Sequence, residues 1–105
     1  MKEPNRKRLI EQLGDILESL GPETVGICGI DDPEAFAASA KSARNYYTHP
    51  TRKMPKDVPV GRELHILGEQ LWFVVRGFVF MELGFTQDEV ASALRRSSRK
   101  HYLLR

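Results

Sequence analysis

The segment ELHILGEQLWFVVRGFVFMEL, residues 63–83, is the most informative part of the sequence about the fold. Apolar residues recur in it at alternating spacings of three and four, the heptad pattern of a helix that packs along a seam. The seam comprises Leu64, Leu67, Leu71, Val74, Phe78 and Met81. Two further apolar stripes run beside it, through Ile66, Phe73 and Phe80 and through Trp72, Val75 and Val79. We therefore predict a long helix over residues 60–83 whose C-terminal half is apolar nearly all round, and hence a subunit interface.

The N-terminal part predicts a helix over residues 6–20 followed by a loop. Leucine and isoleucine side chains recur there every three or four positions, and Gly21-Pro22 ends the helix. The next segment, ETVGICGI at residues 23–30, is apolar and rich in glycine, and no second strand is available to pair with it. We therefore predict that residues 23–30 form a packed loop.

A second predicted helix leads to a polar cluster. Asp32 can act as its N-cap and Pro33 suits its first position, whereas Pro50 disfavours helical geometry at His49. The helix should therefore end at residues 47–49, before a loop that contains three prolines. Its predicted buried stripe comprises Phe36, Ala40, Ala43 and Tyr47.

A fourth helix is predicted over residues 87–97. Thr86 and Glu89 have the spacing of a capping box, and Phe85 with Val90 fits a hydrophobic staple. The basic residues 98–105 are predicted to be a frayed tail or to dock onto a partner. The whole pattern predicts an all-α fold, a four-helix bundle with a long loop between its second and third helices. We expect a single domain over residues 1–105, with its core at residues 6–97.

Composition is typical of a small soluble domain. The chain has 105 residues, of which 41% are hydrophobic and 29% are charged. The lone Cys28 cannot form an internal disulfide, no apolar run reaches the length of a membrane span, and the N-terminus lacks the apolar core of a signal peptide. We therefore expect a cytoplasmic protein with no membrane partner.

Charge is distributed unevenly along the chain. Residues 1–40 carry four Lys/Arg and eight Asp/Glu, whereas residues 41–105 carry twelve Lys/Arg and six Asp/Glu. Basic clusters in the second part suit a polyanion such as RNA, because each neutralised phosphate releases a counterion. The alternative is an ordinary solubilising surface.

The polar cluster ARNYYTHPTRK, residues 43–53, offers chemistry at a helix end. Asn45 and His49 share a helix face, but Arg44 and His49 differ by about 140° on a regular helix, so they converge only if the helix unwinds and His49 swings back. A helix C-terminus favours a protonated imidazole, which poises His49 as an acid or base, and Arg44 can bind a phosphate. The set suits cleavage of RNA by its own 2′-hydroxyl; capping and solvation of the helix end is the alternative.

No metal or cofactor is expected from the sequence. It contains no carboxylate cluster with ligand spacing, no CxxC pair and no glycine-rich phosphate loop. The two histidines of the folded part, His49 and His65, together with Cys28, are too few for a zinc site. Cleavage through an arginine and an acid/base histidine needs no metal ion.

The segment RNYYTH, residues 44–49, resembles the signature of the HEPN superfamily: an arginine, a polar residue that is often asparagine, about three residues, and a histidine. The order of motif, loop and long apolar helix over about residues 30–95 is similar to the C-terminal HEPN domain of ApeA-like proteins. The resemblance implies a helical bundle and a metal-independent ribonuclease whose two motifs face each other across a homodimer. It assigns Arg44 and His49 as catalytic and Asn45 as the polar residue beside them. It also implies phage defence or abortive infection, and an N-terminal sensor domain or a regulatory partner.

Residues around the motif are candidate RNA contacts. Tyr46 can stack on a base, and Thr48 can either bind a phosphate or cap the helix end. A basic rim is predicted at Arg52, Lys53 and Lys56. The alternative to an endoribonuclease is a HEPN module that binds RNA or dimerises without cleaving, and a purely structural dimer domain is a third possibility.

Overall fold

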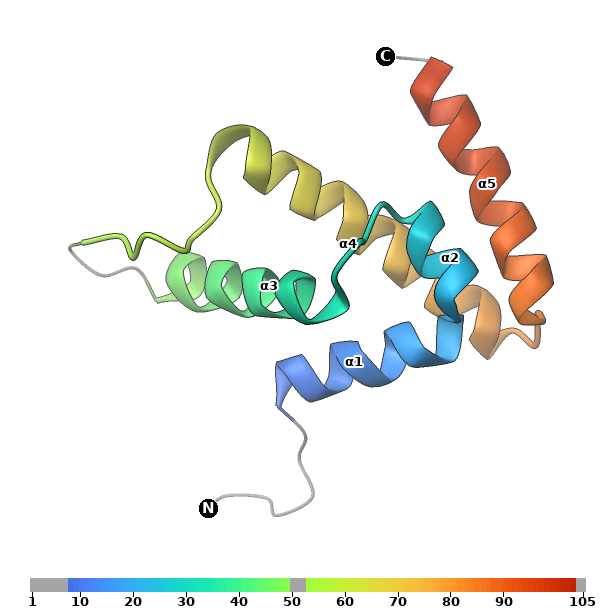
Figure 1. Ribbon diagram of the computed structural model, residues 1–105, viewed down its shortest axis with the longest axis horizontal. Coiled ribbons are helices and arrows are strands. Elements are labelled where there is room, and N and C mark those ends of the chain that lie inside the picture. Colours follow the sequence, from blue (N-terminus) through green and yellow to red (C-terminus); the bar gives the residue numbers. More distant parts are fainter. Residues whose placement is uncertain (1–7, 50–52, 104–105) are drawn as a thin grey trace.

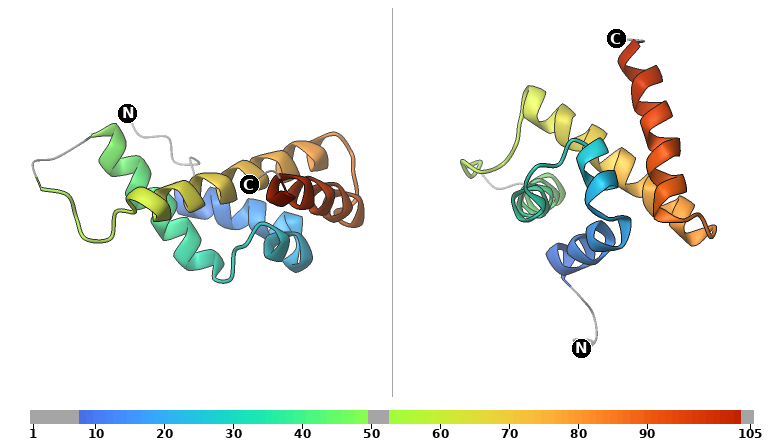
Figure 2. Two further views of the ribbon diagram at one scale, coloured as in Figure 1. Left: turned by 90° about the horizontal axis from the view of Figure 1, so that it is seen from above. Right: turned by 45° about the vertical axis from the view of Figure 1, so that its right-hand side comes forward.

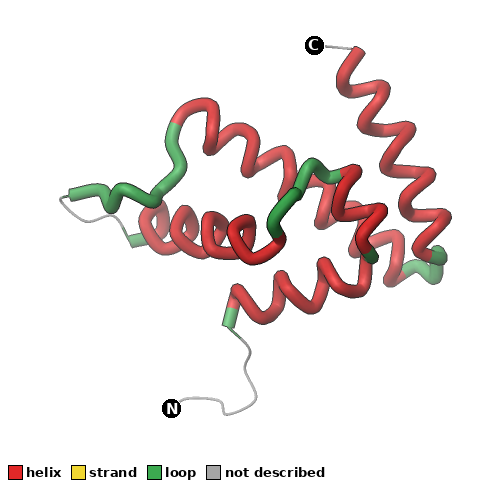
Figure 3. Tube along the Cα trace, viewed as in Figure 1, coloured by secondary structure: helices red, strands yellow, loops and turns green. Residues whose placement is uncertain are grey.

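The structure, a computed structural model, describes the backbone of residues 8–49 and 53–103 and the side chains up to residue 97. Every regular element in these residues is a helix (Figures 1 and 3), which confirms the predicted all-α fold. The helices are α1 (Leu9–Leu20), α2 (Pro22–Ile27), α3 (Pro33–Thr48), α4 (Gly61–Glu82) and α5 (Gln87–Leu103).

The short helix α2 lies where a packed loop was predicted, and that prediction was wrong. Gly21, with φ of 88°, breaks the chain direction after α1, and Pro22 then occupies the first position of a new helix. Proline suits that position because its missing N–H has no helical partner there and its fixed φ is already helical. The next residues include Thr24 and Val25, which are buried. The glycines of this segment therefore did not prevent a helix, because tertiary packing outweighs their low propensity.

Helix α3 begins and ends close to where the sequence predicted. The Asp32 side chain accepts hydrogen bonds from the backbone N–H groups of Glu34 (3.1 Å) and Ala35 (3.2 Å), as expected of an N-cap. Its buried stripe is Phe36, Ala37, Ala40 and Ala43. Tyr47, predicted to continue this stripe, is 46% exposed, because α3 extends beyond the helices that cover it.

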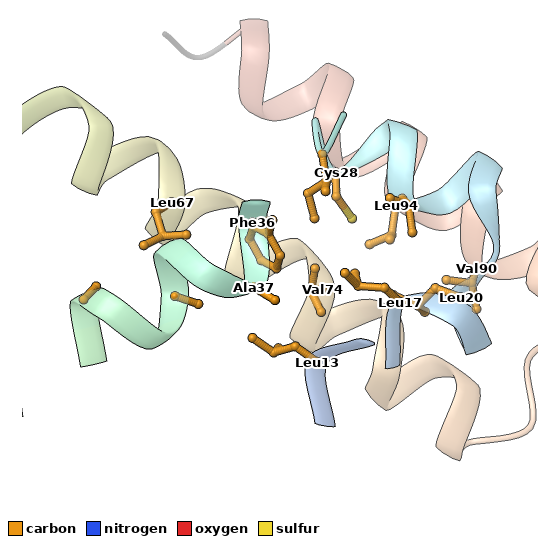
Figure 4. Close-up of a cluster of buried hydrophobic side chains, with 14 residues drawn as sticks. Leu13, Leu17, Leu20, Cys28, Phe36, Ala37, Leu67, Val74, Val90 and Leu94 are labelled. Atoms are coloured by element: carbon orange, nitrogen blue, oxygen red, sulfur yellow. The ribbon is translucent and has the colours of Figure 1, made fainter. Parts of the chain in front are cut away.

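Helix α4 crosses the bundle at Gly77. A Cβ atom at Gly77 would lie 3.0 Å from Leu20 Cδ2 of α1 and 3.3 Å from Leu94 Cδ1 of α5, so the absent side chain permits this close approach. Both leucines are fully buried. The core shown in Figure 4 gathers around this crossing, with Leu13 and Leu17 from α1, Val74 from α4 and Val90 from α5 among its members.

Helix α5 starts with the predicted capping box. The Thr86 backbone N–H donates to Glu89 Oε1 (2.8 Å), and the Glu89 N–H donates back to Thr86 Oγ1 (3.2 Å). Phe85 stacks on Phe80 of α4, with ring centroids 5.0 Å apart. The helix continues to Leu103, beyond the end predicted at residue 97, so the backbone of this basic segment is helical and not frayed.

The bundle is flat and partly open. Its extents are 43 × 39 × 20 Å, and α4 and α5 meet at one end and diverge away from it (Figures 1 and 2). Side-chain hydrogen bonds connect segments that are distant in the sequence. The Gln87 amide of α5 donates to the Ser19 carbonyl of α1 (2.7 Å), and the Gln70 amide of α4 donates to the Gly29 carbonyl after α2 (2.8 Å). In the described part of the chain, one side of the long helix α4 is left exposed, with Trp72, Val75 and Val79 about half accessible or more.

Candidate functional site

The polar cluster lies at the C-terminal end of α3, which stays helical up to the histidine. The His49 backbone N–H donates to the Asn45 carbonyl (3.0 Å), as in any helical turn, and His49 leaves helical geometry only at its own φ of −131° and ψ of 72°. Because the turn is regular, Arg44 and His49 remain about 140° apart around the helix. The unwinding that would bring His49 back to Arg44 is not found in this copy of the chain.

A groove of about 620 Å³ runs beside this helix end. Its wall on α3 includes Asn45, Tyr46 and His49, but Arg44 does not line it. The remaining lining comes from the middle of α3, from α1 and from the loop before α4: Ile10, Ala38, Lys41, Ser42, Pro55, Asp57 and Val58. The volume is in the range of small-molecule sites, about 300–1,000 Å³. The structure thus brings Asn45 and His49 together and turns Arg44 to another side.

Two tyrosines of the motif form an ordered pair. The rings of Tyr46 and Tyr47 meet edge to face, with centroids 5.1 Å apart and an interplanar angle of 84°. The Tyr47 hydroxyl donates to the Pro59 carbonyl (3.1 Å), which ties the end of α3 to the segment leading into α4. Tyr46 is half-buried and lines the groove, so its ring is held in place there.

The predicted basic rim is only partly described. Thr48, Lys53 and Lys56 are exposed, whereas Arg52 lies outside the described residues. Lys56 lines a neighbouring groove of about 310 Å³ with Phe36 and Gln70. The groove beside His49 instead has Lys41 and Asp57, which the sequence analysis did not single out. The spacing of Lys41, four residues before Asn45, was a usable signal, but nothing local points to Asp57.

Exposed apolar side chains form a surface on α4, which we call the outer face and define as Trp72, Val75, Phe78, Val79 and Leu83. Trp72 is 62% exposed and Leu83 is 69% exposed. Apolar patches of this kind are typical of contacts with another molecule. The sequence predicted that α4 is apolar nearly all round, and the apolar side chains of its outer face are indeed exposed to solvent in the monomer.

By length and composition alone, the 22-residue helix α4 could also cross a membrane. This departs from the expectation that no apolar run is long enough. A core helix of a soluble protein meets the same criteria when it is mostly buried, whereas 17% of this stretch of α4 is buried. The two half-buried residues Glu69 and Arg76 on this helix suit a protein surface better than lipid.

A second groove separates α4 from α5. It has a volume of about 360 Å³ and is lined by Trp72, Phe73, Arg76 and Ser97, among others. His65 also lines this groove and is exposed, with Nε2 3.6 Å from Glu69 Oε2. The groove that His65 lines shares no residue with the groove beside His49. A variant of His65 is therefore a suitable control for a variant of His49.

Two further groups bear on chemistry. Within the described residues no three His, Cys, Asp or Glu side chains are placed to hold a metal ion. Cys28 is buried in the core, and burial raises the pKa of its thiol from 9.0 to about 11, so it stays protonated at neutral pH. A protonated thiol is a poor nucleophile, which leaves Cys28 a packing role.

Comparison with known families supports the resemblance. The Apea-like HEPN family matches residues 2–89, most of the chain, and this confirms the resemblance inferred from the motif and its context. No curated protein and no solved structure shows significant similarity to the chain.

Proposed function

The chain belongs to the Apea-like HEPN family, and from this premise we propose that it is an endoribonuclease that needs no metal ion and acts at a site shared by two copies. The family supports an RNA-related nuclease module as the general role. The observation that carries the proposal is the exposed set Arg44, Asn45 and His49 at the end of α3, where Asn45 and His49 line a groove of about 620 Å³.

The proposed reaction is a transfer of the phosphoryl group within the RNA. His49 takes the proton from a ribose 2′-hydroxyl while the oxygen attacks the adjacent phosphorus. The bond from phosphorus to the 5′-oxygen of the next nucleotide breaks, and that oxygen receives a proton from an imidazolium. The products are a 2′,3′-cyclic phosphate and a 5′-hydroxyl. Arg44 stabilises the negative charge that develops on the phosphate oxygens, and Asn45 orients His49 or the phosphate.

A second copy would complete the site. Arg44 and His49 diverge around α3, so a phosphate bound by Arg44 of one copy would meet His49 of the other. The outer face of α4 supplies apolar area for such a homodimer, because it is exposed in one copy. The large aromatic Trp72 on this face is of the type that often dominates binding energy at interfaces.

The biological setting belongs to the same proposal. RNA and a second copy are the proposed partners, and the cytoplasm is the proposed location, with no membrane contact. The family resemblance further supports a role in phage defence or abortive infection. Control by an N-terminal sensor domain or a regulatory partner would keep such a ribonuclease inactive until needed.

Cleavage in the presence of EDTA tests the proposal. The purified protein is incubated with single-stranded and structured RNAs, and product ends are examined for 2′,3′-cyclic phosphate. His49→Ala should lower the cleavage rate by about 10²–10⁴-fold, the usual contribution of a general acid or base. His65→Ala removes an exposed histidine from the other groove and should retain activity. Equal cleavage by wild type and His49→Ala, or no cleavage of any RNA, would contradict the proposal.

A second candidate function is a HEPN module that binds RNA or dimerises without cleaving it. The divergence of Arg44 and His49 in one copy favours it, if a dimer fails to bring them together. This alternative predicts salt-dependent RNA binding that survives His49→Ala and yields no cleaved product.

A further inference from the structure

The groove beside His49 has two walls of different origin. One wall is the surface of α3 that carries Lys41, Ser42 and Asn45, and the other is the loop that carries Pro55 and Asp57. Apolar side chains, including the half-exposed Ile10 and the buried Val58, complete the lining. An apolar lining with a few polar groups at its edges is the usual form of a small-ligand site.

The ring of Tyr46 gives this groove an aromatic surface that is already ordered. Tyr47 contacts it edge to face, and the Tyr47 hydroxyl is itself held by the Pro59 carbonyl. Unpaired RNA bases are commonly bound by stacking on such rings. A ring that is fixed before binding loses little conformational freedom when a base stacks on it.

The polar groups of the two walls are of opposite type. Asp57 offers two carboxylate oxygens as acceptors, whereas Lys41 offers an ammonium group as a donor. Guanine is the base that presents two adjacent donors, N1–H and N2–H, along one edge and two adjacent acceptors, O6 and N7, along another. Uracil presents a single donor between two carbonyl acceptors, which a carboxylate binds poorly.

We propose that this groove binds one unpaired guanine next to the cleaved phosphate, with Asp57 accepting hydrogen bonds from N1–H and N2–H, Lys41 donating to O6 or N7, and Tyr46 stacking on the ring. The inference rests on the proposed ribonuclease function, because His49 lies in the same groove. It adds a base preference to that function. It also assigns specificity to Lys41 and Asp57, two residues outside the motif.

The test compares single-stranded RNAs that are identical except at one position. The base at that position is guanine, adenine, cytosine, uracil or hypoxanthine, the base of inosine. Inosine keeps O6 and N7 but lacks the N2 amino group. Wild type should cleave at guanine at least about tenfold faster than at inosine, since a hydrogen bond to a charged group is lost. Asp57→Asn should reduce this guanine-to-inosine ratio toward one. Asp31→Asn, which removes an exposed carboxylate from a different groove, should leave the ratio unchanged.

Binding is measured in parallel with the same RNAs carrying 2′-O-methyl groups, which block the internal nucleophile. These should bind with the same order of preference, and Tyr46→Leu should weaken binding of every base by removing the stacking surface. Asp57→Asn should abolish the difference between guanine and inosine here as well.

The outcomes separate the two proposals. Cleavage that is equal at all five bases, or an Asp57→Asn effect that is the same for guanine and inosine, would overturn the base site and leave the ribonuclease intact. Binding with the predicted preference but without cleavage would support the base site and overturn the nuclease. Neither binding nor cleavage of any RNA would overturn both.

Discussion

The apolar stripe of α3 is buried, whereas the outer face of α4 is exposed. The stripe of α3 is made of small residues, Ala37, Ala40 and Ala43 with Phe36, and all four are buried. The outer face of α4 is made of larger apolar residues, yet Trp72 is 62% exposed. Larger apolar residues should be covered more readily if burial followed hydrophobicity alone. Burial therefore depends on what lies opposite: α3 packs closely on α1, whereas the outer face of α4 borders only an open groove toward α5 in the described part of the chain.

The largest effect is expected from a charge in the α3 stripe. Ala40→Asp places a carboxylate where a side chain is 6% exposed, without a partner for the charge. We expect the free energy of unfolding to fall by about 3 kcal/mol or more, enough to unfold much of the protein. Chemical denaturation followed by circular dichroism measures it. A stable Ala40→Asp variant would show that the α3 stripe is not a core contact.

The same type of charge on α4 should spare the fold and disrupt the proposed homodimer. Val75 is 51% exposed and Val79 is 47% exposed, so the double variant Val75→Asp/Val79→Asp should unfold at nearly the same denaturant concentration as wild type. Its dimer dissociation constant should rise by about 100-fold or more, because two charges would be buried at the interface. Analytical ultracentrifugation measures the dissociation constant.

Val60→Asp is the matched control for this pair. Val60 is also an exposed apolar residue, but it lies at the N-cap of α4, where aspartate is favourable. It should therefore keep both the fold and the dimer. A wild-type protein that is already monomeric at all concentrations, or a Val75→Asp/Val79→Asp variant that dimerises normally, would remove the outer face as the interface.

A smaller effect is expected from alanine substitutions at two helical glycines, Gly77 in α4 and Gly14 in α1. Gly77→Ala adds a Cβ 3.0 Å from Leu20 Cδ2, so the gain in helix propensity is outweighed by crowding, and the variant should be less stable by about 1 kcal/mol. Gly14→Ala has no atom within 4 Å of the new Cβ and should instead stabilise by up to about 1 kcal/mol. Thermal unfolding of the two variants gives opposite shifts, and shifts of the same sign would contradict the close crossing at Gly77.

The smallest effect concerns Tyr47, where the α3 stripe leaves the core. Tyr47→Phe removes only the hydroxyl that donates to the Pro59 carbonyl, an exposed hydrogen bond worth about 0.5 kcal/mol. Stability should change little, whereas hydrogen exchange in the loop before α4 should become faster. Unchanged exchange in that loop would show that the hydrogen bond does not hold it.

Local signals predicted the helices well. The Asp32 cap and the Thr86–Glu89 capping box were both found, because each involves residues within one turn of the chain. The prediction of a loop at residues 23–30 was wrong. The pair Gly21-Pro22 predicted only the end of α1, but Pro22 is also the first residue of α2. Tyr47 was assigned to the core from its spacing, which carries no information on where the covering helices end.

The candidate site was predictable in part. The motif residues Arg44, Asn45 and His49 followed from spacing and from the resemblance to HEPN domains, and their catalytic roles stay predictions. The groove beside them was not predictable, because Ile10 comes from a segment far away in the sequence and no local signal fixes the course of the loop that carries Asp57. Predicting that Arg44 and His49 point to different sides would have required knowing that α3 stays regular up to its last residue.

The all-α class, most helix ends and the place of the motif could be predicted from sequence alone, because helix propensity, capping and proline effects act between residues a few positions apart. Three features could be read only from the folded chain: which apolar stripe is buried, which residues share a groove with His49 and which face of α4 is exposed. Those features depend on contacts between helices that are distant along the chain. Their free energy comes from the surface that the folded arrangement removes from water.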